Sequence, residues 1–166
     1  MNAETAVPDC ARELLEVIQN SMPRLLALDE ASTARRPAPG KWSPREIIGH
    51  LIDSASNNHQ RFVRAQFQES LVFPGYAQDD WVEVQRYQEA AWPELVDLWA
   101  LFNRHIARVM TGMALATRMR EHTEHNLDEI AFRMLPADQP ATLDWLMCDY
   151  VTHLRHHLRQ IPALRS

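Results

Sequence analysis

The sequence predicts an all-α protein whose architecture is a four-helix bundle. Glycine is rare, with 4 residues in a chain of 166, and runs in which apolar and polar residues alternate are nearly absent. Apolar residues recur instead at spacings of three and four, which is the period of an amphipathic helix. A chain of this length fits one domain over residues 1–166, with a core of its own.

The first helix is expected from about Pro8 to Asp29, with a candidate kink at Pro23. Residues 34–41 hold two prolines and a glycine, so this segment is predicted to be a loop.

The second helix has the clearest start signal. Ser43 stands at the N-cap, Pro44 at the first helical position and Glu46 at the third, which is a capping box with proline where helices favour it. The apolar pattern extends this helix to about Phe67.

The second half of the chain supplies the other two helices. A third helical region is expected over about Trp81–Met113, after a loop at 71–81, with an interruption where Pro93 can begin a new helix. Residues 114–140 are polar and mixed, so they are predicted to be a long connection with some local helix. Thr142 and Leu143 open the last helix, which is expected to end near Ile161.

The charge and cysteine content exclude several classes of protein. The formal charge is −5 and the basic residues are scattered, so we expect no nucleic-acid partner. No apolar run is long enough to span a bilayer, and the first residues lack a signal-peptide pattern. Cys10 and Cys148 form no CxxC motif and need no disulfide, which favours a reduced, cytoplasmic setting.

The last helix contains three histidines in five residues, His153, His156 and His157. Three interpretations are open: a metal site, a chance cluster on the surface, or a pH-sensitive patch. His153 and His157 are four residues apart, so they lie on one helical face and can share a metal ion. His156 is about 100° away from His157 around the helix, so we expect it to be a bystander.

A third ligand must come from another helix, and His50 is the best candidate. It lies two turns into the second helix among apolar residues, so its ring is expected to face the bundle interior. Three nitrogen ligands leave open coordination positions, as in catalytic rather than structural sites, and suit a divalent transition metal such as Zn, Ni, Mn or Fe. Taken alone, an HxxxH pair is more often coincidental, and four other histidines compete: His59, His105, His122 and His125.

Four further polar residues are candidates for supporting this site. Asp53 and Asp149 lie within one turn of His50 and His153, so either carboxylate can orient a ligand ring. Asn57 and Asn103 can contact substrate or water if they point inward. A surface carboxylate and a structural asparagine are the competing interpretations. The sequence singles out no catalytic residue.

The segments "KWSPREIIGHLIDSASNNHQRF" and "TLDWLMCDYVTHLRHHLRQI" together resemble the DinB/YfiT-like superfamily, whose members are regarded as metal-dependent enzymes. The matching elements, in the expected order, are Trp42, Ser43, His50-Leu51, His153, His157, Gln160 and Ile161. The resemblance implies an up-down-down-up four-helix bundle with one divalent metal held by His50, His153 and His157. Characterised relatives include thiol-dependent transferases and a mycothiol-dependent isomerase.

Two functions are compatible with these observations. The first is a metal-dependent enzyme on a small molecule, a thiol-S-transferase or hydrolase in which the metal activates a low-molecular-weight thiol or water. The second is a non-catalytic, stress-responsive metal-binding bundle that acts through an interaction surface. The aromatic-rich 71–99 region suggests this function, because exposed Trp and Tyr often mark interfaces. A homodimer formed through helix faces is a further option.

Overall fold

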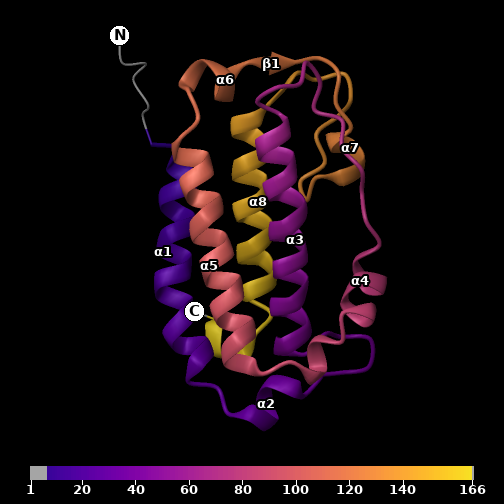
Figure 1. Ribbon diagram of the computed structural model, residues 1–166. Coiled ribbons are helices and arrows are strands. Elements are labelled where there is room, and N and C mark those ends of the chain that lie inside the picture. Colours follow the sequence, from indigo (N-terminus) through magenta and orange to yellow (C-terminus); the bar gives the residue numbers. More distant parts are fainter. Residues whose placement is uncertain (1–6, 166) are drawn as a thin grey trace.

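Four long helices form the bundle that the sequence predicts, and the computed structural model describes residues 7–165 (Figure 1). These helices are α1 (Asp9–Leu26), α3 (Pro44–Arg64), α5 (Trp92–Thr111) and α8 (Leu143–Leu158). Helices α1 and α3 each pack against both α5 and α8. In Figure 1 α1 and α8 run downward and α3 and α5 run upward. The order is therefore up-down-down-up, and the predicted fold class is confirmed.

Helices α3 and α5 are parallel neighbours, so the chain must return along the bundle between them. Residues 65–91 make this connection and include α4 (Gln78–Val84) and a 3₁₀ turn (Tyr87–Glu89), both of which pack on α3. The third predicted helical region is thus two helices, α4 and α5. The break comes just before Pro93, which occupies the first turn of α5 as expected.

Side-chain caps fix the starts of α3 and α8, the two helices that carry the candidate ligands. Ser43 Oγ accepts a hydrogen bond from the backbone N–H of Glu46 at 3.3 Å, and Glu46 Oε2 accepts from Ser43 N–H at 2.8 Å, so the capping box is present. Thr142 Oγ1 accepts from Trp145 N–H at 3.1 Å. Such a cap stabilises a helix by about 1 kcal/mol. The first helix continues through Pro23, and α3 ends at Arg64.

The connections contain short elements, of which the sequence pattern predicts only the local helix within residues 114–140. They are α2 (Glu30–Ala34), α6 (Leu115–Met119), β1 (Glu121–His122), α7 (Leu127–Ile130), β2 (Ala141–Thr142) and a 3₁₀ turn (Pro162–Leu164). Strands β1 and β2 pair antiparallel, with Glu121 opposite Thr142. This pairing brings the chain to the N-terminus of α8, beside the top of α3 (Figure 1).

Large apolar side chains fill the centre of the bundle. Trp92, Trp99, Phe62 and Leu51 are among those with almost no exposed surface. The helices between residues 7 and 165 all lack the combination of length and apolar character that a membrane span requires.

Candidate metal centre

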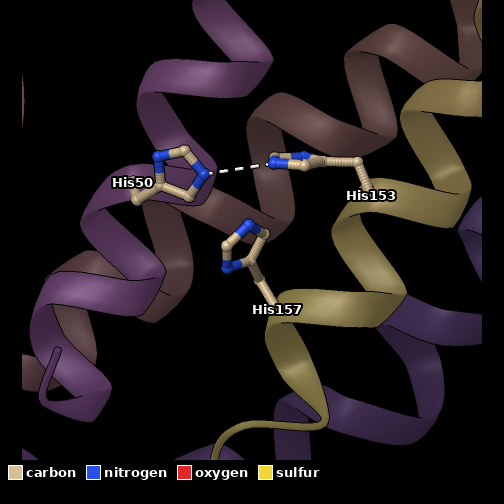
Figure 2. A group of neighbouring side chains, drawn as sticks. All are labelled: His50, His153 and His157. Atoms are coloured by element: carbon tan, nitrogen blue, oxygen red, sulfur yellow. Dashed lines mark hydrogen bonds between the residues drawn. The ribbon is translucent and has the colours of Figure 1, made fainter. Parts of the chain in front are cut away.

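The structure brings His50, His153 and His157 together between α3 and α8. His50 is fully buried and the other two rings are partly buried. Nε2 of His50 lies 3.2 Å from Nε2 of His153, and one nitrogen from each of the three rings lies within 4.8 Å of the others. Figure 2 shows a nitrogen of His157 turned toward the space between the other two rings. The three histidines that helical spacing singles out therefore meet in the structure.

The separation of these nitrogens fits a shared metal ion. Two nitrogens bound at 2.0–2.1 Å in a tetrahedral site are about 3.3 Å apart. The 3.2 Å between His50 and His153 is close to this value, and His157 needs only a small movement to join them. Among the histidine, cysteine and acidic side chains of residues 7–165, these three histidines form the one group whose ligand atoms are close enough to share a metal ion.

All three rings are held in the neutral form that binds metals. Burial, and then the neighbouring His157, lowers the pKa of His50 to about 3. Burial, followed by His157 and His50, lowers the pKa of His153 to about 2. Burial and then His156 lower the pKa of His157 to about 4. A neutral imidazole keeps a lone pair free, so the cluster is ready to ligate without first losing protons.

Two polar side chains lie beside Nδ1 of His153 and Nδ1 of His157. Ser54 Oγ lies 3.4 Å from Nδ1 of His153, so it can accept that N–H and leave Nε2 for a metal. Gln160 Nε2 lies 3.3 Å from Nδ1 of His157 on the outer side of the ring. Sequence reasoning missed Ser54, although it lies four residues after His50 and therefore on the same helical face.

The ring of His50 is held differently from the other two. Its Nδ1 is buried and has no hydrogen-bond partner among the described residues. The ring packs instead against the indole of Trp42, with centroids 4.8 Å apart. Packing against this tryptophan, which comes two residues before α3, positions His50 without a polar contact at Nδ1.

Neither predicted carboxylate orients a ligand ring, which corrects the sequence-based expectation. Asp53 Oδ1 accepts hydrogen bonds from Tyr87 Oη and Gln85 Nε2, each at 2.6 Å, and burial raises the pKa of its carboxyl. Asp149 accepts from the backbone N–H groups of Phe132 and Arg133 at 2.8 and 2.9 Å. Both carboxylates are therefore hydrogen-bonded to connecting segments and not to a ligand histidine.

The two predicted asparagines also have structural partners. Asn103 is fully buried, donates to Trp99 O at 2.8 Å and accepts from the hydroxyl of Tyr150. Asn57 donates to Asp53 O on its own helix at 2.9 Å. Neither bonds a ligand histidine, and a contact of either one with substrate stays a prediction.

The remaining histidines lie outside the cluster. Nδ1 of His122 and Nε2 of His125 face the backbone oxygens of Glu69 and Gln139 at 2.8 and 2.7 Å, so both rings hold connections in place. His59 and His105 pack against each other with ring centroids 5.0 Å apart, on α3 and α5.

His156 is exposed, as expected for a bystander. Its ring is 5.2 Å from that of His157 and lines the neighbouring pocket.

A pocket of about 430 Å³ opens beside the cluster. His153 and His157 form part of its wall, and polar side chains from α3 and α8 form much of the rest, among them Ser54, Arg61 and Asp149. Phe132, from the connection before α8, covers one side, with its ring 5.5 Å from that of His153. A small molecule in this pocket can therefore reach the histidine cluster.

A helical bundle of up-down-down-up order with three converging histidines beside a pocket defines a class of candidate metal-dependent proteins. The family model described as the DinB superfamily matches residues 13–161. The chain therefore belongs to the DinB superfamily, and the resemblance inferred from its two histidine segments is confirmed.

Similar proteins carry names that agree with this site. A protein of Bacillus mycoides (strain KBAB4) named "Putative metal-dependent hydrolase" is 24% identical over 153 residues, covering 92% of this chain and 82% of its own. A Bacillus cereus (strain AH820) protein of the same description is 24% identical over 160 residues, covering 96% and 82%.

A solved structure shows the same fold. It is described as YfiT from Bacillus subtilis, a probable metal-dependent hydrolase with an unusual four-helix bundle topology. The TM-score is 0.76 at 18% sequence identity, over 99% of this chain and 88% of that one.

Proposed function

We propose that this chain is a metal-dependent enzyme that acts on a small molecule. The observation that carries the proposal is the convergence of three neutral imidazoles, those of His50, His153 and His157, of which the last two line a pocket. The pocket volume of about 430 Å³ lies in the range of small-molecule sites. A metal held only for stability would be expected in a closed site with four protein ligands.

The three histidines would hold one divalent transition metal such as Zn, Ni, Mn or Fe through one nitrogen each. A metal of this kind lowers the pKa of a water or thiol and polarises a carbonyl group. Ser54 Oγ, 3.4 Å from Nδ1 of His153, would favour the metal-binding tautomer by accepting the Nδ1–H. Phe132 shields one side of the cluster from solvent. Three protein ligands leave positions at which a substrate can bind.

The nucleophile that the metal would activate is either water or a small thiol. The names of the relatives favour water, and hence hydrolysis. A low-molecular-weight thiol is the second nucleophile that the same site can activate, which would make the protein a thiol-S-transferase. The alternative of a non-catalytic metal-binding bundle is less favoured, because the pocket gives a small molecule access to the ligands.

Metal analysis of the purified protein tests the ligand set. Protein stripped with a chelator and reloaded with Zn, Ni, Mn or Fe(II) should retain a single equivalent after gel filtration. His50→Ala, His153→Ala and His157→Ala should each lose it. His156→Ala is the matched control, since this exposed ring lies on the same helix outside the cluster. The proposal fails if the wild type retains no metal, or if His156→Ala loses as much as His153→Ala.

Activity is then tested on the loaded and metal-free protein with panels of ester and amide substrates, and of electrophiles mixed with small thiols. Turnover that appears only in the loaded form, and not in His153→Ala, supports an enzyme. The panel that responds identifies the nucleophile.

A further inference from the structure

Arg61 lies at the end of a polar stripe that begins at the metal centre. His50, Ser54, Asn58 and Arg61 follow one another on α3 at spacings of four, four and three, so they share one helical face. All four are buried. Ser54, Asn58 and Arg61 line the same pocket as His153. The face of α3 that presents a ligand at one end therefore presents a cation at the other.

The guanidinium of Arg61 has few partners for so buried a cation. The residue is 6% exposed. Its Nη1 donates to Asn58 Oδ1 at 3.4 Å and its Nη2 donates to Pro74 O at 3.2 Å. An arginine has five N–H donors, and both acceptors here are neutral. Burial lowers the pKa of Arg61, as expected for a charge that its surroundings do not fully compensate.

The other two buried arginines of residues 7–165 are each paired with a carboxylate. Arg45 forms an ion pair with Glu30, and Arg118 forms one with Asp144 at 3.2 Å. Arg61 has no carboxylate within 4.0 Å in the described part of the chain. A missing counter-ion is therefore particular to the arginine that faces the pocket.

The carboxylate in the pocket wall is already used. Asp149 is buried, and its two oxygens accept from the backbone N–H groups of Phe132 and Arg133 and from Arg133 Nε at 3.0 Å. Asp149 is thus paired with Arg133 and forms no ion pair within 4.0 Å with Arg61, although its charge partly offsets the effect of burial on the pKa of Arg61. Glu129, which also lines the pocket, is exposed and unpaired with Arg61.

We infer that Arg61 binds an oxyanion group, a carboxylate or a phosphate, of the molecule that enters this pocket. The planar fork of a guanidinium matches both groups with two parallel hydrogen bonds. The inference rests on the proposed function for the other end of that molecule, which would react at the histidine cluster. Ser54 and Arg61 are seven residues apart, or about 10 Å along the helix, so the molecule is elongated, with its anion remote from the reacting group.

Calorimetric titration of the zinc-loaded protein with dicarboxylates of increasing length, from succinate to suberate, tests this inference. One carboxylate can reach the metal while the other reaches Arg61. Arg61→Gln should weaken the tightest dicarboxylate about 10- to 100-fold. The matched half-amide, adipamate for adipate, should bind the wild type as weakly as the diacid binds Arg61→Gln. A phosphonocarboxylate of the same length shows which oxyanion the site prefers.

Arg64→Gln is the control, since Arg64 is an exposed guanidinium one turn further along α3. It should bind the dicarboxylate as the wild type does. The inference is overturned if Arg61→Gln retains wild-type affinity, or if the half-amide binds as tightly as the diacid.

Folding is controlled with Arg61→Met, which removes the charge while keeping a long side chain. Because an uncompensated buried charge is destabilising, this variant should unfold at or above the wild-type temperature and still lose the anion. If both Arg61 variants unfold well below the wild type, the residue has a structural role and the inference fails.

Zinc content, measured on every sample, separates this inference from the proposed function. Arg61→Gln should keep its zinc. If the wild type takes up none, the proposed function fails, and the anion site is then judged on metal-free protein with inorganic phosphate. Binding of phosphate that Arg61→Gln abolishes would support the anion site, and equal binding by both proteins would overturn it.

Discussion

The histidine cluster should make the metal-free protein sensitive to mild acid, and His153 allows the size of the effect to be worked out. Burial beside His157 and His50 lowers the pKa of His153 from 6.5 to about 2. In the unfolded chain this ring recovers its ordinary pKa. Between these two values the unfolded state binds a proton that the folded state excludes. The stability is therefore complete above pH 6.5 and decreases as the pH falls below it.

The lowered pKa sets the magnitude. Each pH unit inside the window costs about 1.4 kcal/mol for one histidine. From about pH 7.5 to about pH 5, the loss at His153 is therefore about 2 kcal/mol. His50 and His157, with pKa values of about 3 and about 4, act in the same direction. The loss for the whole cluster then lies between about 2 and 6 kcal/mol, a large part of the stability of an ordinary domain.

Urea unfolding in the presence of a chelator, at these two pH values, measures the effect. His153→Gln removes one titrating ring, so this variant should lose about 2 kcal/mol less than the wild type on acidification. His156→Gln keeps all three rings of the cluster and removes only the smaller effect of His156 on the pKa of His157, so its loss should lie closer to that of the wild type than to that of His153→Gln. The buried carboxyl of Asp53 is present in all three proteins, so its contribution cancels. If the wild type and His153→Gln lose the same stability, the assignment of a buried neutral ring at His153 is refuted.

Three further predictions concern the metal and the helix that carries His50. Zinc binding near pH 6 should release almost no protons, whereas three ordinary histidines would release about two. Calorimetry in buffers of different ionisation enthalpy counts the released protons. A release of about two protons would contradict the lowered pKa values. Ser54→Ala should weaken zinc binding about tenfold, because His153 loses its Nδ1 partner. Ser56→Ala, partly exposed on the same helix, should not; competition with a chromogenic chelator compares them, and wild-type affinity in Ser54→Ala would count against the role of this hydroxyl. Gly49→Ala should destabilise the fold by about 2 kcal/mol or more, since a Cβ there would lie 2.1 Å from Cδ2 of Tyr87. In urea unfolding, Tyr87→Ala should lower the free energy of unfolding less in the Gly49→Ala background than in the wild type. If the two substitutions lower it additively, the clash is excluded.

The parts of the site that sequence could predict are those fixed by helical spacing. The Ser43 capping box sets where α3 begins, and the period of the helix then directs His50 inward. The same period places His153 and His157 on one face of α8. Helices in a bundle must turn such faces toward one another, so the meeting of the three rings follows from local rules and one packing constraint.

The roles of Asp53 and Asp149 could not be predicted in this way. Spacing places each near a histidine, but the hydrogen-bond partner of each comes from a connecting segment. Tyr87 lies 34 residues after Asp53, and Phe132 lies 17 residues before Asp149. The position of such segments depends on the tertiary path of the chain and not on a periodic pattern.

Two other features depend on residues that are distant in the sequence, so they could not be predicted from it. Cys10 and Cys148, at opposite ends of the sequence, come close where α1 meets α8, and the neighbouring Cys148 thiol together with burial raises the pKa of Cys10. Arg61 is in helical register with His50, but an arginine in a helix is more often a solvated surface residue. Its burial depends on the 71–77 segment, whose Pro74 carbonyl accepts from it.

The two halves of the bundle bury different kinds of side chain. Most of the buried residues of α1 and α5 are apolar, with Leu14, Ile18 and Trp99 among them. Where α3 meets α8 the bundle buries neutral histidines, and α3 adds an arginine without a counter-ion, groups whose burial costs free energy unless they are paired. A bundle selected only for stability would place apolar residues at these positions. Their retention is explained if a metal and an anionic ligand complete this half, because both would compensate groups that the chain leaves unpaired.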